Sequence, residues 1–448
     1  MSFDRDSHLL LDEAVALLEN RYKDLPPHTQ QIDLVQLREP LMAAALRLQD
    51  SDPYHHPLYI GHMQKPPHPI ARLAYSLTLL LNPNNHGYDG GRASSDMEQE
   101  AISEIAHMFG WASFQGHLCS GGTLANFEAL WIAREQHPDK GIAASCQAHY
   151  THERLSGVLS VPFHAIPTDP AGRMDVNALE QVLQHGDIGT VVVTIGTTAT
   201  GAVDPLDQIL DLQSRYAFRI HVDAAYGGYF TLANNLDAVT RNALNAISQA
   251  DSIAIDPHKH GLQPYGCGCL LFRDSTVRHH YQHNSPYAYF DTDDPHLGEI
   301  SLECSRPGAS AVALWTTQRL LPLVQDGTFA QNLASGRNAA LIFYQALIKD
   351  TRFAPLFPPQ LDIVVWAMPA SSASLSSQRA RALHAAARKN DLHMSLVTIP
   401  QAMLLTCHPV SIWDQDSIIC LRVCLMKPEH HEWITEILAR LNSAAASL

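Results

Sequence analysis

Between residues 117 and 272, short apolar runs alternate with segments whose apolar residues recur every three or four positions. Short runs rich in β-branched residues are typical of buried strands, and the longer periodic segments are typical of amphipathic helices. The strands are expected at Gly141–Cys146, Val161–Ile166, Thr190–Ile195, Phe218–Asp223, Ser252–Asp256 and Gly268–Phe272. The helices are expected at 124–136, 151–158, 175–185, 206–214 and 237–249. This alternation predicts an α/β fold with a mostly parallel central sheet covered by helices on both faces.

The regions on either side have a mainly helical pattern. Helical spacing at 8–20 and 32–48, on either side of Pro26-Pro27, predicts an N-terminal arm of two helices. Further helices are expected at 70–81, at 97–109, as one long helix near 309–350, and at 429–445. C-terminal strands are expected at Leu361–Ala367, Leu392–Val397 and Ile418–Leu425.

These patterns predict three regions in the chain of 448 residues. They are an N-terminal helical arm over 1–60, a large domain over 61–325, and a small C-terminal α/β domain over 326–448. We see no internal repeat and no low-complexity linker between them.

Composition narrows the possible partners and the compartment. The net charge is −15 and no basic stripe is present, so a nucleic-acid partner is not expected. No apolar run approaches the roughly 20 residues that span a bilayer, and no secretory signal is visible at the start. The eight cysteines lack the spacing of a disulfide framework, and the 26 histidines lack the spacing of a zinc site. We therefore expect a cytoplasmic protein without a metal site or a membrane partner.

Candidate chemistry begins with Lys259. The chain has only seven lysines, and Lys259 is the one lysine between Lys140 and Lys349. It follows an apolar run, in Ile255-Asp256-Pro257-His258-Lys259-His260. Lysine can lose its proton and form a Schiff base with a carbonyl, whereas arginine cannot. The alternative is a solvated loop lysine, and the neighbouring residues decide between the two.

Other reactive residues also follow predicted strands, where ligands of open α/β sheets gather. Asp223 ends one strand, and Thr194-Ile195-Gly196-Thr197-Thr198 ends another. Ser120-Gly121-Gly122-Thr123 forms a glycine turn before a helix, which suits a single phosphate group because helical N–H groups face it. An isolated Asp223 would more often cap a helix or form a turn.

Together these parts suit pyridoxal 5'-phosphate (PLP). This cofactor needs an amine for its aldehyde, a carboxylate for its ring nitrogen, donors for its phosphate and a flat side chain beside its ring. Lys259, Asp223, the turn Gly121–Thr123 and His149 can fill these four roles in that order.

The chain resembles the group II PLP-dependent amino-acid decarboxylases of fold type I, which include glutamate, aromatic-amino-acid and tyrosine decarboxylases. The motifs that carry the resemblance occur in the family's order: Ser120-Gly121-Gly122-Thr123, Gln147-Ala148-His149-Tyr150, Gly172-Arg173-Met174-Asp175, Gly196-Thr197-Thr198, His221-Val222-Asp223-Ala224-Ala225, Asp256-Pro257-His258-Lys259 and Ser305-Arg306-Pro307-Gly308. Asp256 stands where asparagine is common in the family, and Ser305 where glycine is frequent.

This resemblance implies an aspartate-aminotransferase-like fold and a homodimer with the active site at the subunit interface. It implies that Lys259, Asp223 and His149 are catalytic, and that Tyr287 or Tyr289 returns a proton to the substrate carbon. The cofactor-binding residues that it implies are Gly121, Gly122, Thr123, His149, Thr197, Asp223, Ala225, His258 and Lys259. The candidate substrate-binding residues are His62, His86 and Arg306.

Several of these roles have alternatives. His258 could contact the phosphate or the substrate, or make a structural hydrogen bond. Arg306 could bind a carboxylate or phosphate, or pin the loop before it. His62 and His86 could equally have loop or capping roles. The loop that holds Tyr287 and Tyr289 could also be a packed surface loop.

The expected reaction is decarboxylation of an L-amino acid to its amine and CO₂. The alternative activities on the same scaffold are those of a carbon–carbon lyase, a desulfinase or an aldehyde synthase, and Phe290 keeps the last of these open. A non-catalytic binding protein would be expected to lack the lysine or the aspartate, and both are present.

Overall fold

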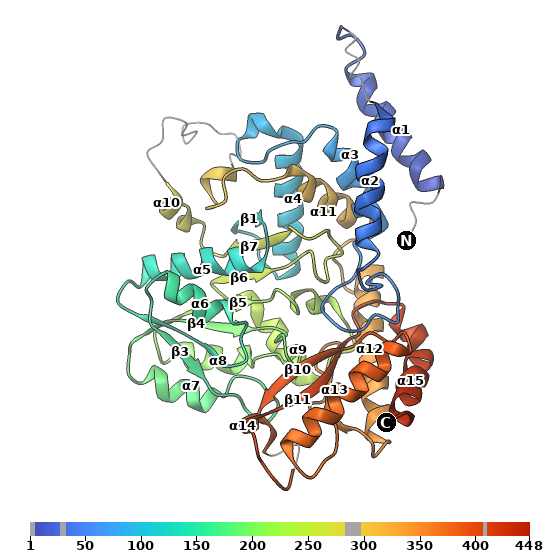
Figure 1. Cartoon of the computed structure of the whole chain (residues 1–448). Coiled ribbons are helices and arrows are strands. Elements are labelled where there is room, and N and C mark those ends of the chain that lie inside the picture. The colour runs from blue at the N-terminus through green and yellow to red at the C-terminus, as the bar shows by residue number, and fades with distance from the viewer. Residues whose placement is uncertain (1–4, 27–32, 283–296, 406–409) are drawn as a thin grey trace.

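The computed structural model describes residues 5–26, 33–282, 297–405 and 410–448. In these residues the chain forms a seven-stranded sheet and a four-stranded sheet, which lie beside each other with helices around them (Figure 1). No helix within the described ranges has both the length and the apolar character needed to cross a membrane.

The large sheet has the strand order β1-β7-β6-β5-β4-β2-β3. Its strands are β1 (Gln115–Cys119), β2 (Gly141–Ser145), β3 (Phe163–Ile166), β4 (Ile188–Thr194), β5 (Arg219–Asp223), β6 (Ser252–Ile255) and β7 (Gly268–Phe272). Strands β2 to β6 pair in parallel, and β7 is antiparallel to both of its neighbours. The prediction of a mostly parallel sheet is therefore confirmed. Strand β1 was not predicted, because its sequence QGHLC lacks a run of β-branched residues.

Helices cover both faces of this sheet (Figure 1). They are α5 (Gly122–Gln136), α6 (Thr151–Val158), α7 (Val176–Leu183), α8 (Leu206–Gln213) and α9 (Ala238–Asn245). Ile142 and Val192 pack in one apolar cluster with residues of α5 and α6. The adjacent residues Ala143 and Val191 belong to the cluster that contains α7, α8 and α9. Successive strand residues thus point to opposite faces, which explains the nearly continuous apolar runs in the sequence.

The small sheet is antiparallel and has the order β10-β11-β9-β8. Its strands are β8 (Ala354–Pro355), β9 (Ile363–Ala367), β10 (Ser395–Pro400) and β11 (Ser417–Cys424). Helices α13 (Ala373–Lys389), α14 (Gln401–Leu404) and α15 (His430–Ala446) belong to the same part of the chain. Helix α13 was not among the predicted elements, and β10 begins three residues later than expected.

The prediction of one long helix near 309–350 is wrong. The structure has α11 (Gly308–Leu320) and α12 (Thr328–Ile348), separated by a seven-residue connection, 321–327. Pro322 cannot donate the backbone hydrogen bond that a continuous helix needs. Asp326 has a φ of +61°, which also interrupts a right-handed helix.

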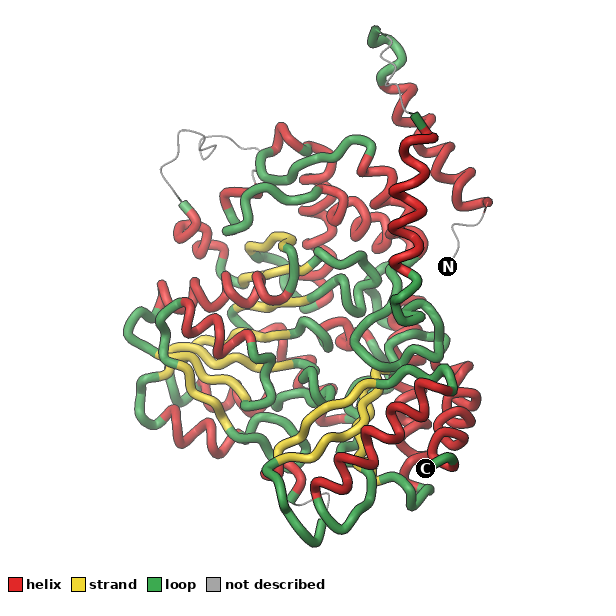
Figure 2. Tube along the Cα trace, viewed as in Figure 1, coloured by secondary structure: helices red, strands yellow, loops and turns green. Residues whose placement is uncertain are grey.

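The N-terminal arm projects from the rest of the molecule (Figure 2). It contains α1 (Arg5–Arg21) and α2 (Leu34–Leu48), and neither helix has a buried residue. Helices α3 (Pro69–Leu79) and α4 (Arg92–Met108) pack against α11, and the short helix α10 (Arg278–Tyr281) follows β7. The proposed division at residues 60 and 325 stays a prediction.

Gly268 allows two backbones to come unusually close. A Cβ atom at this position would lie 2.5 Å from the Cα of Gly121. We therefore expect Gly268→Ala to lower the free energy of unfolding by about 1–3 kcal/mol, because backbone atoms must move to make room. Urea unfolding followed by circular dichroism measures this change.

Gly157→Ala is the matched control. Nothing lies within 4 Å of a Cβ atom at Gly157, which is in helix α6. Alanine there should raise the free energy of unfolding by about 0.5–1 kcal/mol, since glycine is the poorer helix former. Equal effects of the two substitutions would contradict the role assigned to the close approach at Gly268.

Candidate functional site

A cavity of about 290 Å³ lies where β4, β5 and β6 end and helix α5 begins. Carboxyl ends of parallel strands meet at one edge of a sheet, so residues far apart in the sequence gather there. The lining residues are Ser120, Gly121, Gly122, Thr123, Leu124, Asn126, His149, Thr151, Thr194, Gly196, Thr198, Asp223, Ala225, Tyr226, Asp256, His258 and Lys259. Most of the predicted cofactor-binding residues are therefore brought together.

Asp223, at the end of β5, is the most completely bonded carboxylate of the cavity. Its Oδ2 accepts from Asn126 Nδ2 at 3.2 Å and lies 2.8 Å from His152 Nε2. Its Oδ1 accepts the backbone N–H of Ala225 at 3.1 Å. Burial alone would raise the pKa of Asp223, but the hydrogen bond and charge of His152, together with the charge of Lys259, lower it well below its usual value. Asp223 is thus held as a carboxylate.

His221 fixes the orientation of the Asn126 amide. The His221 Nε2 lies 2.8 Å from Asn126 Oδ1, and its Nδ1 lies 2.8 Å from Ser252 Oγ. Burial lowers the pKa of His221 to about 3, so its ring is neutral at pH 7. Because the ring donates to the amide oxygen, the NH₂ group of Asn126 is left to face Asp223.

Lys259 lies on the turn after β6. Its Nζ is 3.2 Å from Asp256 Oδ2, and His258 Nε2 is 3.4 Å from the same oxygen. Burial lowers the pKa of His258. The His258 ring also packs against Tyr265, with the ring centroids 4.9 Å apart. Lys259 therefore enters the cavity beside two residues of its own turn.

The start of helix α5 is open to an anion. No side chain caps this helix, whose first turn begins at Gly121 and Gly122. A Cβ atom on Gly122 would lie 2.9 Å from Asp256 Oδ2, and one on Gly121 would lie 3.1 Å from His258 Cε1. Glycine thus leaves space at a helix end whose N–H groups and dipole favour negative charge.

His149 lies on the turn after β2 and lines the cavity. Its Nδ1 lies 2.9 Å from Thr151 Oγ1 and 3.4 Å from the backbone N of Thr151. Burial lowers the pKa of His149. A neutral, flat ring at this wall is compatible with stacking against a planar ligand.

The end of β4 contributes Thr194 to the lining, and the loop after it contributes Gly196 and Thr198 but not Thr197. The side chain of Thr197 is completely buried, lies 2.9 Å from Thr200 Oγ1 and accepts the backbone N–H of Ala202. Its predicted contact with the cofactor therefore has no support from the cavity lining.

Arg306 and His86 also lie outside the lining residues. Buried Arg306 donates to the carbonyl oxygen of Leu118 and lies 3.4 Å from Glu98 Oε1. These contacts favour the loop-pinning alternative. The backbone oxygen of His86 accepts the N–H of Gly298 at 2.8 Å.

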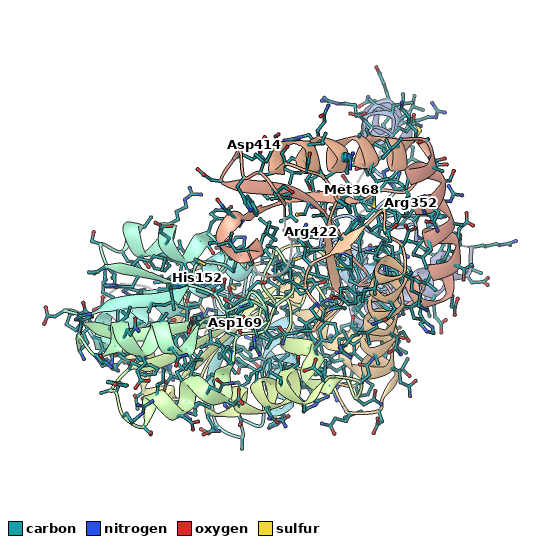
Figure 3. All side chains as sticks on the ribbon, turned by 90° about the horizontal axis from the view of Figure 1, so that it is seen from below. His152, Asp169, Arg352, Met368, Asp414 and Arg422 are labelled. Carbon is teal, nitrogen blue, oxygen red and sulfur yellow. The ribbon has the colours of Figure 1, made fainter. Side chains whose placement is uncertain are left out.

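His62 reaches the cavity only indirectly. Its Nδ1 lies 3.3 Å from Arg422 Nη2. Arg422, on β11 and labelled in Figure 3, also donates to the carbonyl oxygen of Thr198 at 2.7 Å. Tyr287, Tyr289 and Phe290 lie outside the described residues, so their roles stay predictions.

Sequence reasoning missed Asn126 and His152, which hold Asp223. Asn126 lies four positions after Gly122, in the first part of α5, and His152 lies three positions after His149, at the start of α6. This closeness to recognised motif residues was the available signal. Among the described residues, no group of three or more His, Cys, Asp or Glu side chains could hold a metal ion.

The cavity fits the four requirements of PLP. It offers an amine, a fully ionised carboxylate, an uncapped helix start lined by glycines, and a flat ring. Lys259 and Asp223 line the same cavity but contact different partners: Lys259 contacts Asp256, and Asp223 contacts His152.

Comparison with known sequences matches most of the chain to one family. The family described as the pyridoxal-dependent decarboxylase conserved domain matches residues 50–368. The L-tyrosine decarboxylase of Enterococcus faecium is 28% identical over 69% of this chain and 68% of its own length. The L-tyrosine decarboxylase of Levilactobacillus brevis is 28% identical over 68% of this chain and 66% of its own length. The chain thus spans about two thirds of the length of these two relatives.

Another relative is covered more fully. The probable L-aspartate decarboxylase of Halobacterium salinarum is 31% identical over 69% of this chain and 82% of its own length.

Two solved structures have the same overall fold. Mouse CSAD in its apo form aligns over all of this chain and 93% of its own, with a TM-score of 0.78 and 22% identity. Oryza sativa TDC with PLP and tryptamine aligns over all of this chain and 99% of its own, with a TM-score of 0.79 and 17% identity. The expected fold class is therefore confirmed.

The ionised state of Asp223 predicts a pH-dependent stability difference in the cofactor-free protein. Its folded-state pKa lies below the unfolded value of about 3.9. Its stabilising effect is therefore complete above about pH 4 and is lost as the pH falls through the folded-state pKa. We expect Asp223→Asn to lower the free energy of unfolding by about 1.5–3 kcal/mol at pH 7, and this difference to shrink toward pH 3.

Urea unfolding at pH 7, 5 and 3 measures the difference. Asp139→Asn is the control, because Asp139 is exposed and lies outside the cavity. This substitution should change the free energy of unfolding by the same small amount at all three pH values. A difference at Asp223 that is the same at every pH would contradict the assigned ionisation.

Proposed function

Because the chain belongs to the pyridoxal-dependent decarboxylase family, we propose that it removes the α-carboxyl group of an L-amino acid as CO₂ and leaves the amine, with PLP as its cofactor. The observation that carries this proposal is that Lys259 and Asp223 line one cavity together with the uncapped start of α5. A carbonyl-reactive amine, a ring-nitrogen partner and a phosphate site are thus present in one place.

In this proposal Lys259 would bond to the cofactor aldehyde, and Asp223 would pair with the ring nitrogen. When bound, PLP withdraws electrons from the bond that breaks. The contacts from His152, Asn126 and Ala225 keep Asp223 ionised, so it can hold a proton on that nitrogen.

The other cavity residues bind and orient. The N–H groups at Gly121, Gly122 and Thr123 would hold the phosphate, and the His149 ring, which lines the same cavity, would lie against the cofactor ring. His258 is placed beside the glycine turn, where a Cβ on Gly121 would meet its ring. Tyr287 or Tyr289 stays our candidate for returning a proton to the substrate carbon.

The relatives do not identify one particular amino acid as the substrate, because their described substrates differ. They are described as acting on tyrosine, aspartate or 2,4-diaminobutyrate, whose side chains differ in charge and size. These substrates share the α-amino and α-carboxyl groups, which are also the groups that the proposed reaction requires. We therefore propose the type of reaction, and the side chain that the substrate carries is to be found by screening a panel of amino acids.

We also propose a homodimer. Helices α1 and α2 have no buried residues, although they expose many large apolar side chains. These are Leu9, Leu10, Leu17, Leu34, Val35, Leu37, Leu41, Met42, Leu46 and Leu48. Many exposed large apolar side chains on two helices are typical of a protein interface, and a second copy of the chain is the partner that the family resemblance implies.

The proposed compartment is the cytoplasm. Six cysteines of the described residues form no disulfide bond: Cys119, Cys146, Cys267, Cys269, Cys304 and Cys424. Free thiols of this number fit a reducing compartment.

Lys259→Ala tests the proposed reaction. The unmodified chain with PLP should show the visible absorbance of lysine-bound cofactor and release CO₂ from at least one amino acid of a panel. The panel contains the standard amino acids, 2,4-diaminobutyrate and cysteine sulfinate. The variant should lose the visible band and retain less than about one thousandth of the turnover, since loss of a covalent catalyst is among the costliest substitutions.

Lys349→Ala serves as the control, because this exposed lysine lies outside the cavity. Product analysis separates the reactions: decarboxylation gives CO₂ and an amine in equal amounts, whereas an aldehyde synthase consumes O₂ and gives CO₂, an aldehyde and ammonia in place of the amine. A visible band that persists in Lys259→Ala would overturn the assignment of this lysine.

The homodimer is tested by sedimentation equilibrium. The full chain should sediment with twice the mass of one chain, and the triple variant Leu17→Ser/Val35→Ser/Leu41→Ser should shift toward single chains because apolar contact area is lost. The control Glu13→Ser/Arg38→Ser changes exposed polar residues on the same helices and should remain dimeric. A full chain that sediments as a single copy contradicts the proposal.

A further inference from the structure

Asp256 is a second buried carboxylate of the cavity, with a different set of partners from Asp223. Only 3% of its surface is exposed. Its Oδ2 lies 3.2 Å from Lys259 Nζ and 3.4 Å from His258 Nε2. Its Oδ1 is buried without a hydrogen-bond partner among the described residues. The charge of Asp256 is therefore balanced from one side, by the two bases of its own turn.

Lysine, rather than histidine, is the cation of this group near pH 7. Burial lowers the pKa of His258, so its ring is mainly neutral there. A buried carboxylate is strongly disfavoured unless a cation or several donors compensate it. The Lys259 ammonium group is placed to do so, and the N-terminal end of α5, which approaches Asp256 at Gly122, adds favourable positive potential.

The approach of α5 also fixes the position of the carboxylate. A Cβ atom on Gly122 would lie 2.9 Å from Asp256 Oδ2 and 3.2 Å from Oδ1. Only a residue without a side chain fits between the helix and Asp256, and the carboxylate is thus confined to the side of Lys259.

We propose that Asp256 is a positioning residue that holds the Lys259 amine as an ammonium ion whenever this amine is not bonded to the cofactor. The role in catalysis rests on the proposed function. If the bonded lysine nitrogen carries one hydrogen and a positive charge, a substrate that arrives as R–NH₃⁺ would pass two of its hydrogens to that nitrogen during the exchange. Lys259 would then leave as –NH₃⁺, and Asp256 is placed to pair with it.

This pairing has a direct chemical effect. An ammonium nitrogen has no free electron pair, so a paired Lys259 does not compete with the substrate amine.

Other titratable groups that act on Lys259 are distributed over several elements. They are Asp223 at the end of β5, His149 after β2, and His258, His260 and Tyr265 near Lys259 itself. Asp223 is already bonded to His152, Asn126 and Ala225. Asp256 is the carboxylate in direct ion-pair contact with Lys259.

The test measures how fast Lys259 reacts with acetic anhydride in the cofactor-free protein, as a function of pH. Mass spectrometry quantifies the acetylated peptide, and the exposed Lys349 and Lys389 act as internal references in every sample. In Asp256→Asn we expect Lys259 to react about tenfold faster at pH 8 than in the unmodified chain, which corresponds to a profile shifted down by about one pH unit. The reference lysines should not change.

Asp256→Glu is the matched variant that keeps the charge, and it should retain the slow profile of the unmodified chain. If Asp256→Asn fails to fold, the unmodified chain still decides, because the proposal requires Lys259 to react no faster than exposed Lys349 at each pH. An unchanged profile in folded Asp256→Asn, or a Lys259 that outpaces Lys349 in the unmodified chain, overturns the proposal.

This measurement uses neither substrate nor cofactor. A protein that shows the shift but does not decarboxylate would overturn the proposed function and leave the pairing intact. A protein that decarboxylates but shows no shift in the acetylation profile of Lys259 would overturn the pairing with Asp256 and leave the proposed function intact.

Discussion

The buried carboxylate of Asp223 is the interaction on which the arrangement of the site depends. An ionised carboxylate is stable in a protein interior only when donors surround it. Three elements supply them: β5 through its own following turn, α5 through Asn126, and α6 through His152. His221, from the same strand as Asp223, orients Asn126. Asp223 therefore stays ionised only while α5 and α6 are packed on the sheet, because these helices carry Asn126 and His152.

The two carboxylates of the cavity differ because their partners differ. Asp223 accepts hydrogen bonds on both oxygens, whereas Asp256 contacts bases on one oxygen only. Asp223 is suited to a permanent charge, and Asp256 to a contact that forms and breaks. The same residue type thus serves a fixed and a transient role within one cavity, and the environment alone separates them.

The central sheet and the main site residues could be predicted because local pattern determines both. Parallel strands that are buried on both faces give apolar runs, and their ends meet, so Asp223 and Lys259 could be placed together from sequence. The contacts of Arg306 depend on tertiary packing that no local pattern records. The break at 321–327 had a local signal in Pro322, whereas strand β1 lacks the run of β-branched residues that would have marked it. Asn126 and His152 were not predicted for a related reason. Both form hydrogen bonds with Asp223, which is distant from them in the chain.

One wall of the cavity is held from the C-terminal sheet. Arg422 of β11 donates to the carbonyl oxygen of Thr198, and Tyr226 donates to Asp362 just before β9 at 2.6 Å. Both Thr198 and Tyr226 line the cavity. If the two sheets moved apart, these buried polar groups would lose their partners, so we expect the sheets to unfold together. The C-terminal part thus supports the cavity wall although none of the described residues that line the cavity comes from it.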